Sequence, residues 1–161
     1  MYKRQGKNYA EGHAIAGTTD DAIYQTERST TGTGFVYEEE VENGFYDVEI
    51  KLAEIWSGAQ EAGTRKFSLK VEDEFVFNDL DLTKEAGFAT ALDYVGTIEV
   101  TDGALTIEAI NGDANNAKLS GFSVWESDAS TAQAFAQGDI FDFRDGLDAA
   151  SSGLTTDDFL V

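Results

Sequence analysis

Two aromatic residues stand where they could hold a sugar ring. Tyr24 follows a pair of aspartates, and Trp56 ends a run of alternating apolar residues and precedes Ser57-Gly58. The axial C–H face of a pyranose packs on an aromatic ring, whereas its hydroxyls need short polar partners. Gln25 and Glu54, which lie within two residues of these rings, can supply such partners. The sequence therefore predicts either a sugar-stacking site or two ordinary core aromatics.

The chain offers little for catalysis. It has no cysteine, which excludes thiol catalysis, iron–sulfur clusters and cysteine-type zinc sites, and its single histidine, His13, lies in a segment rich in glycine and alanine. Glu27 and Glu54 lie beside aromatics and are the carboxylates to consider for a glycosidase, which needs two such groups about 5–10 Å apart. The alternatives are an ion pair of Glu27 with Arg28 or another base, and a hydrogen-bonded strand-end carboxylate for Glu54. We therefore expect no enzymatic activity.

Calcium is the natural candidate ion, because hard cations take oxygen ligands from Asp, Asn and backbone carbonyls. Asp20 and Asp21, together with Asp113 in the polar segment 111–116, are the candidate ligands. Neither segment shows the full EF-hand pattern. The alternative is a solvated polar turn at each place.

The charge balance limits the kinds of partner that this chain can bind. Of 161 residues, 31 are acidic and 11 are Lys or Arg, so the formal net charge is −20. A polyphosphate or an anionic membrane would be repelled by most of this surface, so we expect neither nucleic-acid binding nor membrane insertion. No apolar run approaches membrane-spanning length, and the first residues lack the apolar core of a secretory signal. Such a surface suits high salt, a calcium-rich exterior, or simple solubility.

The elements that must position these residues are strands. Apolar and polar residues alternate with a period of two, which predicts strands with one buried face. The expected strands are Phe35–Val41, Tyr46–Leu52, Lys66–Glu72, Phe75–Phe77, Thr97–Val100, Leu105–Ala109 and Leu119–Trp125. The dipeptides Asn43-Gly44, Asp102-Gly103 and Asn111-Gly112 predict turns, and Asp81–Ala91 predicts a loop with one helical turn. Many short strands separated by turns indicate an all-β fold, an antiparallel β-sandwich or barrel.

Several segments resemble, in order, those of malectin domains. The likeness covers about residues 9 to 126. The matching segments are Ala16–Arg28 (AGTTDDAIYQTER), Val41–Val48 (VENGFYDV), Leu52–Trp56 (LAEIW), Arg65–Val71 (RKFSLKV), Asp79–Leu82 (DLDL), Thr101–Ile107 (TDGALTI) and Asn115–Gly121 (NNAKLSG).

The resemblance implies a jelly-roll-like β-sandwich, of the malectin and galactose-binding-like type, that binds carbohydrate without reacting with it. The family's ligand is held by aromatics and an acid on loops at one rim. Its aromatic positions fall on Tyr24, on Trp56 and Ser57, and on Tyr9 upstream. Its acid falls on Asn115, next to Asn116, so a carboxylate is replaced by an amide. The implied ligand is an oligosaccharide that contains glucose.

One departure concerns the ends of the chain. Family members open with a strand that has no counterpart before Tyr9. We expect residues 1–127 to form the sandwich and residues 128–161 to form an acidic C-terminal segment. That segment either supplies the missing strand, through Asp139–Phe143, or packs elsewhere. Its many apolar residues argue against a disordered linker.

Two functions follow as hypotheses. The first is a non-catalytic, lectin-like carbohydrate-binding module of a secreted or cell-surface protein of bacterial type, joined to neighbouring domains of a longer chain. The alternative is a structural or protein-interaction module, stabilised by calcium, of a large adhesin-like extracellular protein in which the sugar site has eroded.

Overall fold

A computed structural model describes residues 7–30 and 32–127. Strands dominate this part of the chain, with two one-turn α-helices and one 3₁₀ turn between them. In chain order the elements are β1 (Lys7–Ala10), α1 (Asp21–Tyr24), β2 (Thr26–Ser29), β3 (Gly34–Glu40), β4 (Gly44–Ala53), η1 (Ser57–Ala59), β5 (Lys66–Val71), β6 (Glu74–Leu80), α2 (Leu82–Glu85), β7 (Ala91–Val100), β8 (Ala104–Ala114), β9 (Lys118–Leu119) and β10 (Gly121–Glu126).

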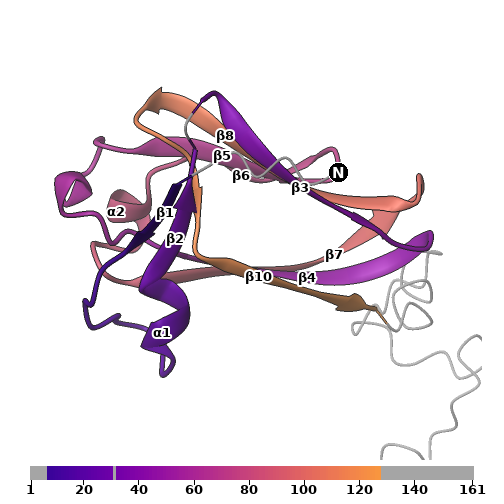
Figure 1. Ribbon diagram of the computed structural model, residues 1–161, viewed down its shortest axis with the longest axis horizontal. Helices are drawn as coiled ribbons and strands as arrows, with labels where there is room; N and C mark the ends of the chain where they lie inside the picture. Colours follow the sequence, from indigo (N-terminus) through magenta and orange to yellow (C-terminus); the bar gives the residue numbers. More distant parts are fainter. Residues whose placement is uncertain (1–6, 31, 128–161) are drawn as a thin grey trace, which may run out of the picture. The chain divides into compact units, whose positions relative to one another are not determined.

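The strands form two facing sheets, which confirms the predicted antiparallel β-sandwich. One sheet has the order β10-β4-β7 and the other the order β3-β8-β5-β6. A third, small sheet, β1-β2-β9, stands across one end of the sandwich (Figure 1). Every pairing between these strands is antiparallel.

The core follows directly from the alternation in the sequence. On β4 the side chains of Val48, Ile50 and Leu52 are fully buried, while the residues between them are partly exposed. β5 and β8 repeat this pattern and turn their apolar side chains to the same core. Each fully buried aliphatic or aromatic side chain contributes roughly 1.5–3 kcal/mol, so this layer supplies much of the stability of the sandwich. The expected helical turn after Asp81 is α2.

The predicted turn at Asn111-Gly112 is wrong. Both residues lie inside β8, which runs on to Ala114. The register against β5 shifts here, since Lys66 pairs with Ala114 and the next residue of β5 pairs with Asn111. A Cβ at Gly112 would collide with the carbonyl of Lys66. The glycine therefore permits a bulge and a close backbone approach instead of a turn.

The Asn43-Gly44 segment does not close a hairpin within one sheet. β3 before it pairs with β8, whereas β4 after it pairs with β7 and β10. The connection therefore carries the chain from one sheet to the other. The Asp102-Gly103 prediction holds, because Gly103 has a φ of 85° in the link between β7 and β8.

The expected strand Leu119–Trp125 is divided. Lys118–Leu119 pairs with β2 in the small sheet, and Gly121–Glu126 pairs with β4. The acidic segment 128–161, with Asp139–Phe143, lies outside the described residues, so its role in completing the sandwich stays a prediction. Within residues 7–30 and 32–127, no helix is long and apolar enough to span a bilayer.

Candidate functional site

The predicted binding residues gather at the end of the sandwich that the small sheet covers. We call this end the rim and define it as α1, η1 and residues 115–117, the connection between β8 and β9 (Figure 1). The rim rests on the ends of β2, β4 and β9. The contacts beneath the rim determine which of its side chains are exposed to solvent.

A buried ion pair lies under the rim. The Nζ of Lys118 on β9 is 2.5 Å from Oε2 of Glu27 on β2, and it also donates to the carbonyl oxygen of Ala53 at the end of β4. The lysine side chain is fully buried and the glutamate nearly so. Burial lowers the pKa of Lys118, and the nearby carboxylates of Glu27 and Glu54 oppose that shift. The ion pair joins β2 and β9 within the small sheet, and the bond to Ala53 ties that sheet to β4 of the main sandwich.

A second buried pair adjoins the first. Glu54 Oε2 is 2.8 Å from Arg65 Nε, an ion-pair distance, although the N–H is not aligned with the oxygen as in a hydrogen bond. Glu54 Oε1 accepts from the backbone N–H of Trp56 at 3.1 Å, and Arg65 Nη1 donates to the carbonyl of Asn116 at 2.7 Å. Burial raises the pKa of Glu54, against the effect of Lys118 and Arg65. This network fixes the end of β4, η1 and residues 115–117 relative to one another.

Trp56 is held by its neighbours in one place. The guanidinium carbon of Arg65 lies 5.6 Å from the centroid of the Trp56 ring, within cation–π range. A Cβ at Gly58 would collide with three carbon atoms of the indole, so the close approach of η1 to the ring requires glycine there. The indole is half-buried. It is therefore braced on two sides and still partly open to water.

The prediction that Tyr24 presents a stacking surface is wrong. Its side chain is 2% exposed and packs with Ile15, Ala53 and Ile55. Its hydroxyl donates to Asp93 Oδ1 at 2.6 Å, and burial is the largest cause that raises its pKa. The single turn of α1 packs Tyr24 against β4, so Tyr24 is an ordinary core aromatic. Trp56, in contrast, is partly exposed to solvent.

Gln25 lines a shallow hollow near α1, and Tyr9 lies on β1 next to Ala10, another residue of its lining. Tyr9 is half-buried against the Tyr24 cluster, and its hydroxyl donates to Glu11 Oε1 at 2.6 Å, which raises the pKa of Tyr9 to about 12. Gln25 Nε2 donates to the carbonyl of His13 at 2.8 Å. The hollow has a volume of about 380 Å³. Its lining residues are Ala10, Glu11, Gly12, Ala22, Gln25 and Thr26.

The three remaining predicted residues are exposed. Ser57 opens η1, and Asn115 has a φ of 63°, in the left-handed region that asparagine tolerates. The Nδ2 of Asn116 donates to the carbonyl of Thr30 at 3.1 Å. Through Arg65, Asn116 and Trp56 belong to the same contact network. The rim therefore combines one braced ring with short polar side chains.

The predicted calcium ligands do not converge. Asp20 and Asp21 lie at the start of α1, and Asp113 lies near the end of β8. Among the described residues, no group of three or more acidic or histidine side chains is placed to hold a metal ion. The three aspartates therefore do not form the proposed site, because the polar segments that carry them are separate.

Sequence reasoning missed Arg65 and Lys118. Lys118 pairs with Glu27 across 91 residues of chain, and Arg65 reaches Glu54 from the loop before β5. The one available signal was that Lys118 lies between the apolar residues Ala117 and Leu119, in a chain with few bases. Neither position has a local sequence pattern from which its ion-pair partner could be predicted.

The comparisons with known proteins agree with this architecture. The family model described as Malectin domain matches residues 2–128. Malectin of Danio rerio is 29% identical over 114 residues, which are 62% of this chain and 39% of that protein. The chain thus spans well under half the length of that curated relative.

Solved structures share the fold at low sequence identity. A Bacteroides uniformis beta-glucuronidase matches with a TM-score of 0.66 and 22% identity, over 76% of this chain and 14% of that one. The ANX2 ectodomain from Arabidopsis thaliana matches with a TM-score of 0.64 and 12% identity, over 78% of this chain and 41% of that one. With a family match over most of its length, this chain belongs to the malectin domain family, a family of carbohydrate-binding domains.

Proposed function

We propose that this domain is a non-catalytic carbohydrate-binding module of a secreted or cell-surface protein of bacterial type. Its ligand is an oligosaccharide that contains glucose, bound at the rim. The observation that carries the proposal is the braced indole of Trp56, which keeps a partly exposed ring beside polar side chains in a chain of the malectin domain family.

In this proposal Trp56 packs on the C–H face of a pyranose. Ser57, Asn115 and Asn116 hydrogen-bond to its hydroxyls, and Tyr9 and Gln25 contact a further residue of the oligosaccharide at the hollow beside α1. Glu54 is a positioning residue, since it is fully buried and acts through Trp56 and Arg65. So few contacts give modest affinity, which several copies on one chain or surface would raise.

The surroundings of Glu27 and Glu54, the two carboxylates considered for a glycosidase, support a non-catalytic function. Glu27 is paired with Lys118 and Glu54 with Arg65, and their side chains are almost wholly removed from solvent. A general acid and a nucleophile must both touch the glycosidic bond. Neither group is placed to do so.

Isothermal titration calorimetry with glucose-containing disaccharides and trisaccharides tests the proposal. We expect measurable binding that Trp56→Ala removes. The matched control is Trp125→Ala, which changes the other tryptophan of the chain, on β10 outside the rim, and should bind as the unaltered protein does. Equal binding by both variants would remove Trp56 from the site, and no heat with any glucose-containing sugar would contradict the proposal.

A gain-of-binding variant sharpens the test. Asn115→Asp restores the acid of the family pattern at an exposed position with a positive φ, which aspartate tolerates about as well as asparagine. A carboxylate forms stronger hydrogen bonds to sugar hydroxyls than an amide does. We expect tighter binding by Asn115→Asp and no change in Asp113→Asn, which alters charge on the neighbouring strand.

Two observations favour the alternative, a structural or protein-interaction module. Tyr24 is sealed in the core, and Ser57 stands where the resemblance implies an aromatic. This function predicts no glycan binding. It predicts instead a higher melting temperature with calcium or association with a neighbouring domain of the same protein.

A further inference from the structure

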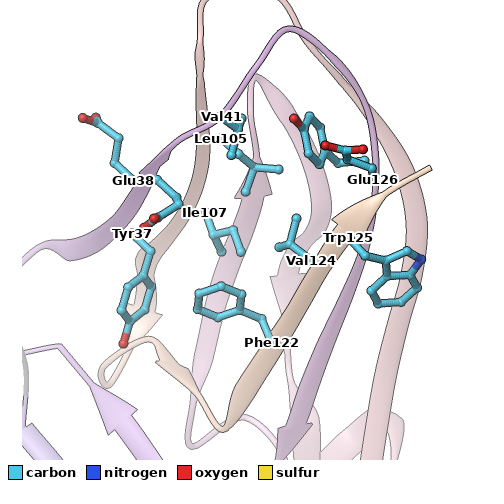
Figure 2. A pocket seen from close by; sticks show the side chains of 11 residues that line it. Tyr37, Glu38, Val41, Leu105, Ile107, Phe122, Val124, Trp125 and Glu126 are labelled. Atoms are coloured by element: carbon cyan, nitrogen blue, oxygen red, sulfur yellow. The ribbon is translucent and has the colours of Figure 1, made fainter.

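An apolar groove runs along one side of the sandwich, between β3 at the edge of one sheet and β10 at the edge of the other. It has a volume of about 490 Å³. The rings of Tyr37 and Phe122 meet across it with centroids 5.2 Å apart, and Val124 continues its wall along β10 (Figure 2). Leu105 and Ile107 on β8, both part of the core, also line it.

The groove leaves large apolar side chains exposed to water. Phe122 is 39% exposed and Trp125 is 47% exposed, although both lie on a strand of the main sandwich. On the opposite side of the sandwich, Phe77 of β6 and Tyr94 of β7 pack on each other, with ring centroids 6.1 Å apart, and against the core. Exposed apolar surface of this kind marks a place where another molecule packs.

The groove lies beside an open strand edge. In the part of the chain that the structure describes, β10 pairs with β4 alone. The N–H of Ser127 donates to the carbonyl of Phe45 at 2.8 Å. In an antiparallel ladder with this register, the N–H groups of Phe122, Val124 and Glu126 therefore point away from β4. A row of such groups is a template for a further strand, which a binding partner can supply.

A strand added to β10 would send side chains into the groove. Phe122 and Val124 lie opposite Ile50 and Val48, which are fully buried, so this face of β10 is turned to the core. Residues directly opposite each other in an antiparallel ladder have their side chains on the same face. Every second residue of the added strand would therefore enter the groove beside Phe122 and Val124.

The acids at the groove determine the charge of the partner that fits. Glu38, Glu39 and Glu126 line it, and none of the described residues that line it is basic. Glu126 follows Phe122 and Val124 on the same face of β10, and it is exposed. It stands where the third inward side chain of an added strand would lie. Because complementary charges at an interface speed association and exclude wrong partners, a basic side chain fits at this position.

We propose that the groove and the edge of β10 bind an extended peptide segment of another protein, which adds to β10 as an antiparallel strand. Every strand pairing in the sandwich is antiparallel, and that pairing is the more stable one. The segment has two apolar side chains at alternate positions, beside Phe122 and Val124, and a Lys or Arg two residues before them, beside Glu126. This surface is separate from the rim, so the inference does not depend on sugar binding.

A second copy of this chain is the weaker occupant. Each copy carries a formal charge of −20 and would bring Glu38, Glu39 and Glu126 to the contact, so two copies repel each other at this face. A basic segment of another protein is attracted by the same acids. Because these charges are exposed, added salt should weaken its binding.

NMR titration of the full chain with a short capped peptide tests the inference. The probe is the hexapeptide RTVTFT, whose Arg, Val and Phe share one face when it is extended. We expect saturable binding with a Kd below about 1 mM. At saturation, hydrogen exchange should slow about tenfold at the amides of Phe122, Val124 and Glu126. The amides of Ser123 and Trp125, which face β4, should not change.

Two kinds of control peptide separate strand addition from general attraction to an acidic, apolar surface. RVTTFT has the same composition and charge but puts Val and Phe on opposite faces, so it should bind at least about tenfold more weakly. Methylation of the backbone nitrogen of Val in RTVTFT removes a ladder hydrogen bond to β10, whereas the nitrogen of the following Thr points away from β10. We therefore expect only the methylation at Val to remove binding.

A charge exchange tests the position of the base. Glu126→Lys should weaken binding of RTVTFT about fivefold or more and strengthen binding of ETVTFT, in which Glu replaces the Arg. The matched control is Glu99→Lys, which makes the same change of charge at an exposed position on β7 of the same sheet. It should affect both peptides far less. Equal effects of the two substitutions would contradict the contact between the base and Glu126.

Three further outcomes would overturn the inference. One is no saturable binding of RTVTFT, and another is equal binding of RTVTFT and RVTTFT. The third is slow exchange at the amides of Phe122, Val124 and Glu126 before any peptide is added. If that protection grows with protein concentration, a second copy covers β10, and if it does not, the chain covers this edge itself.

Discussion

The rim and the groove differ in the kind of side chain that they bury and in the kind that they expose to water. Under the rim, the side chains of Glu27, Glu54, Arg65 and Lys118 are buried, and each of these four charges has a partner of opposite sign. At the groove, apolar side chains face water and no described residue covers them. Buried charges are costly unless paired, so they fix one arrangement of the loops above them. An exposed apolar surface does not hold neighbouring loops in one arrangement, and it is a typical place for another segment or protein to pack. The difference indicates that the loops of the rim are held in one arrangement, whereas the apolar surface of the groove is left open among the described residues.

The largest effect should come from breaking the charge pairing at the rim. Lys118→Met leaves Glu27 buried without a cation, which should lower the free energy of unfolding by about 3–5 kcal/mol. Urea denaturation at neutral pH measures it. The control is Lys70→Met, whose lysine pairs with the fully exposed Asp73 at 3.9 Å and should cost no more than about 1 kcal/mol. Similar losses in the two variants would mean that the rim is not held by its buried charges.

A smaller effect should come from moving the braced ring. Gly58→Ala places a methyl group where the Trp56 indole lies, so the ring must shift. We expect sugar affinity to fall about tenfold, which corresponds to about 1.4 kcal/mol. The control is Gly44→Ala, because a Cβ there meets nothing within 4 Å. Unchanged affinity in Gly58→Ala would show that the ring position does not matter to binding.

A pH-dependent effect should come next. The pKa of Tyr9 is about 12 in the folded chain, above its ordinary value of 10, so the folded state holds this proton more firmly. Between pH 10 and 12 the folded chain binds more protons than the unfolded chain, and stability should fall as pH rises through that window. Tyr9→Phe should flatten this part of the curve of urea midpoint against pH. A curve as steep as that of the unaltered protein would contradict the Tyr9–Glu11 assignment.

The smallest effect should come from the groove. Trp125→Ala removes a ring that is 47% exposed, so it should change the free energy of unfolding by less than about 1 kcal/mol. Thermal and urea unfolding measure it. A loss as large as that of Lys118→Met would reverse the comparison and make the groove part of the structural core.

Alternation in the sequence was enough to predict most of the sandwich. Each run with a period of two, such as Tyr46–Leu52, is a strand whose apolar side chains are buried, because one face of a strand must pack on a core. The bulge at Gly112 was not predictable, because a turn and a close backbone approach both select glycine. Only the pairing partner, Lys66, distinguishes them.

The position of the candidate site residues in the fold was predictable in part. Family resemblance placed Trp56, Ser57 and Asn115 at one end of the fold, where the structure has them. It could not show that Tyr24 is sealed, because burial depends on how tightly α1 packs on β4. It also could not name Lys118 as the partner of Glu27, since a contact across 91 residues leaves no local pattern.

The amine of Lys118 can also be used to detect when the small sheet detaches from the sandwich. No part of its side chain is accessible in the folded chain, whereas Lys84 stands in the open. An amine-reactive reagent should therefore label Lys84 at once and reach Lys118 only when the small sheet detaches. The ratio of the two labels, read by mass spectrometry, would time that opening under any condition in which the protein is kept.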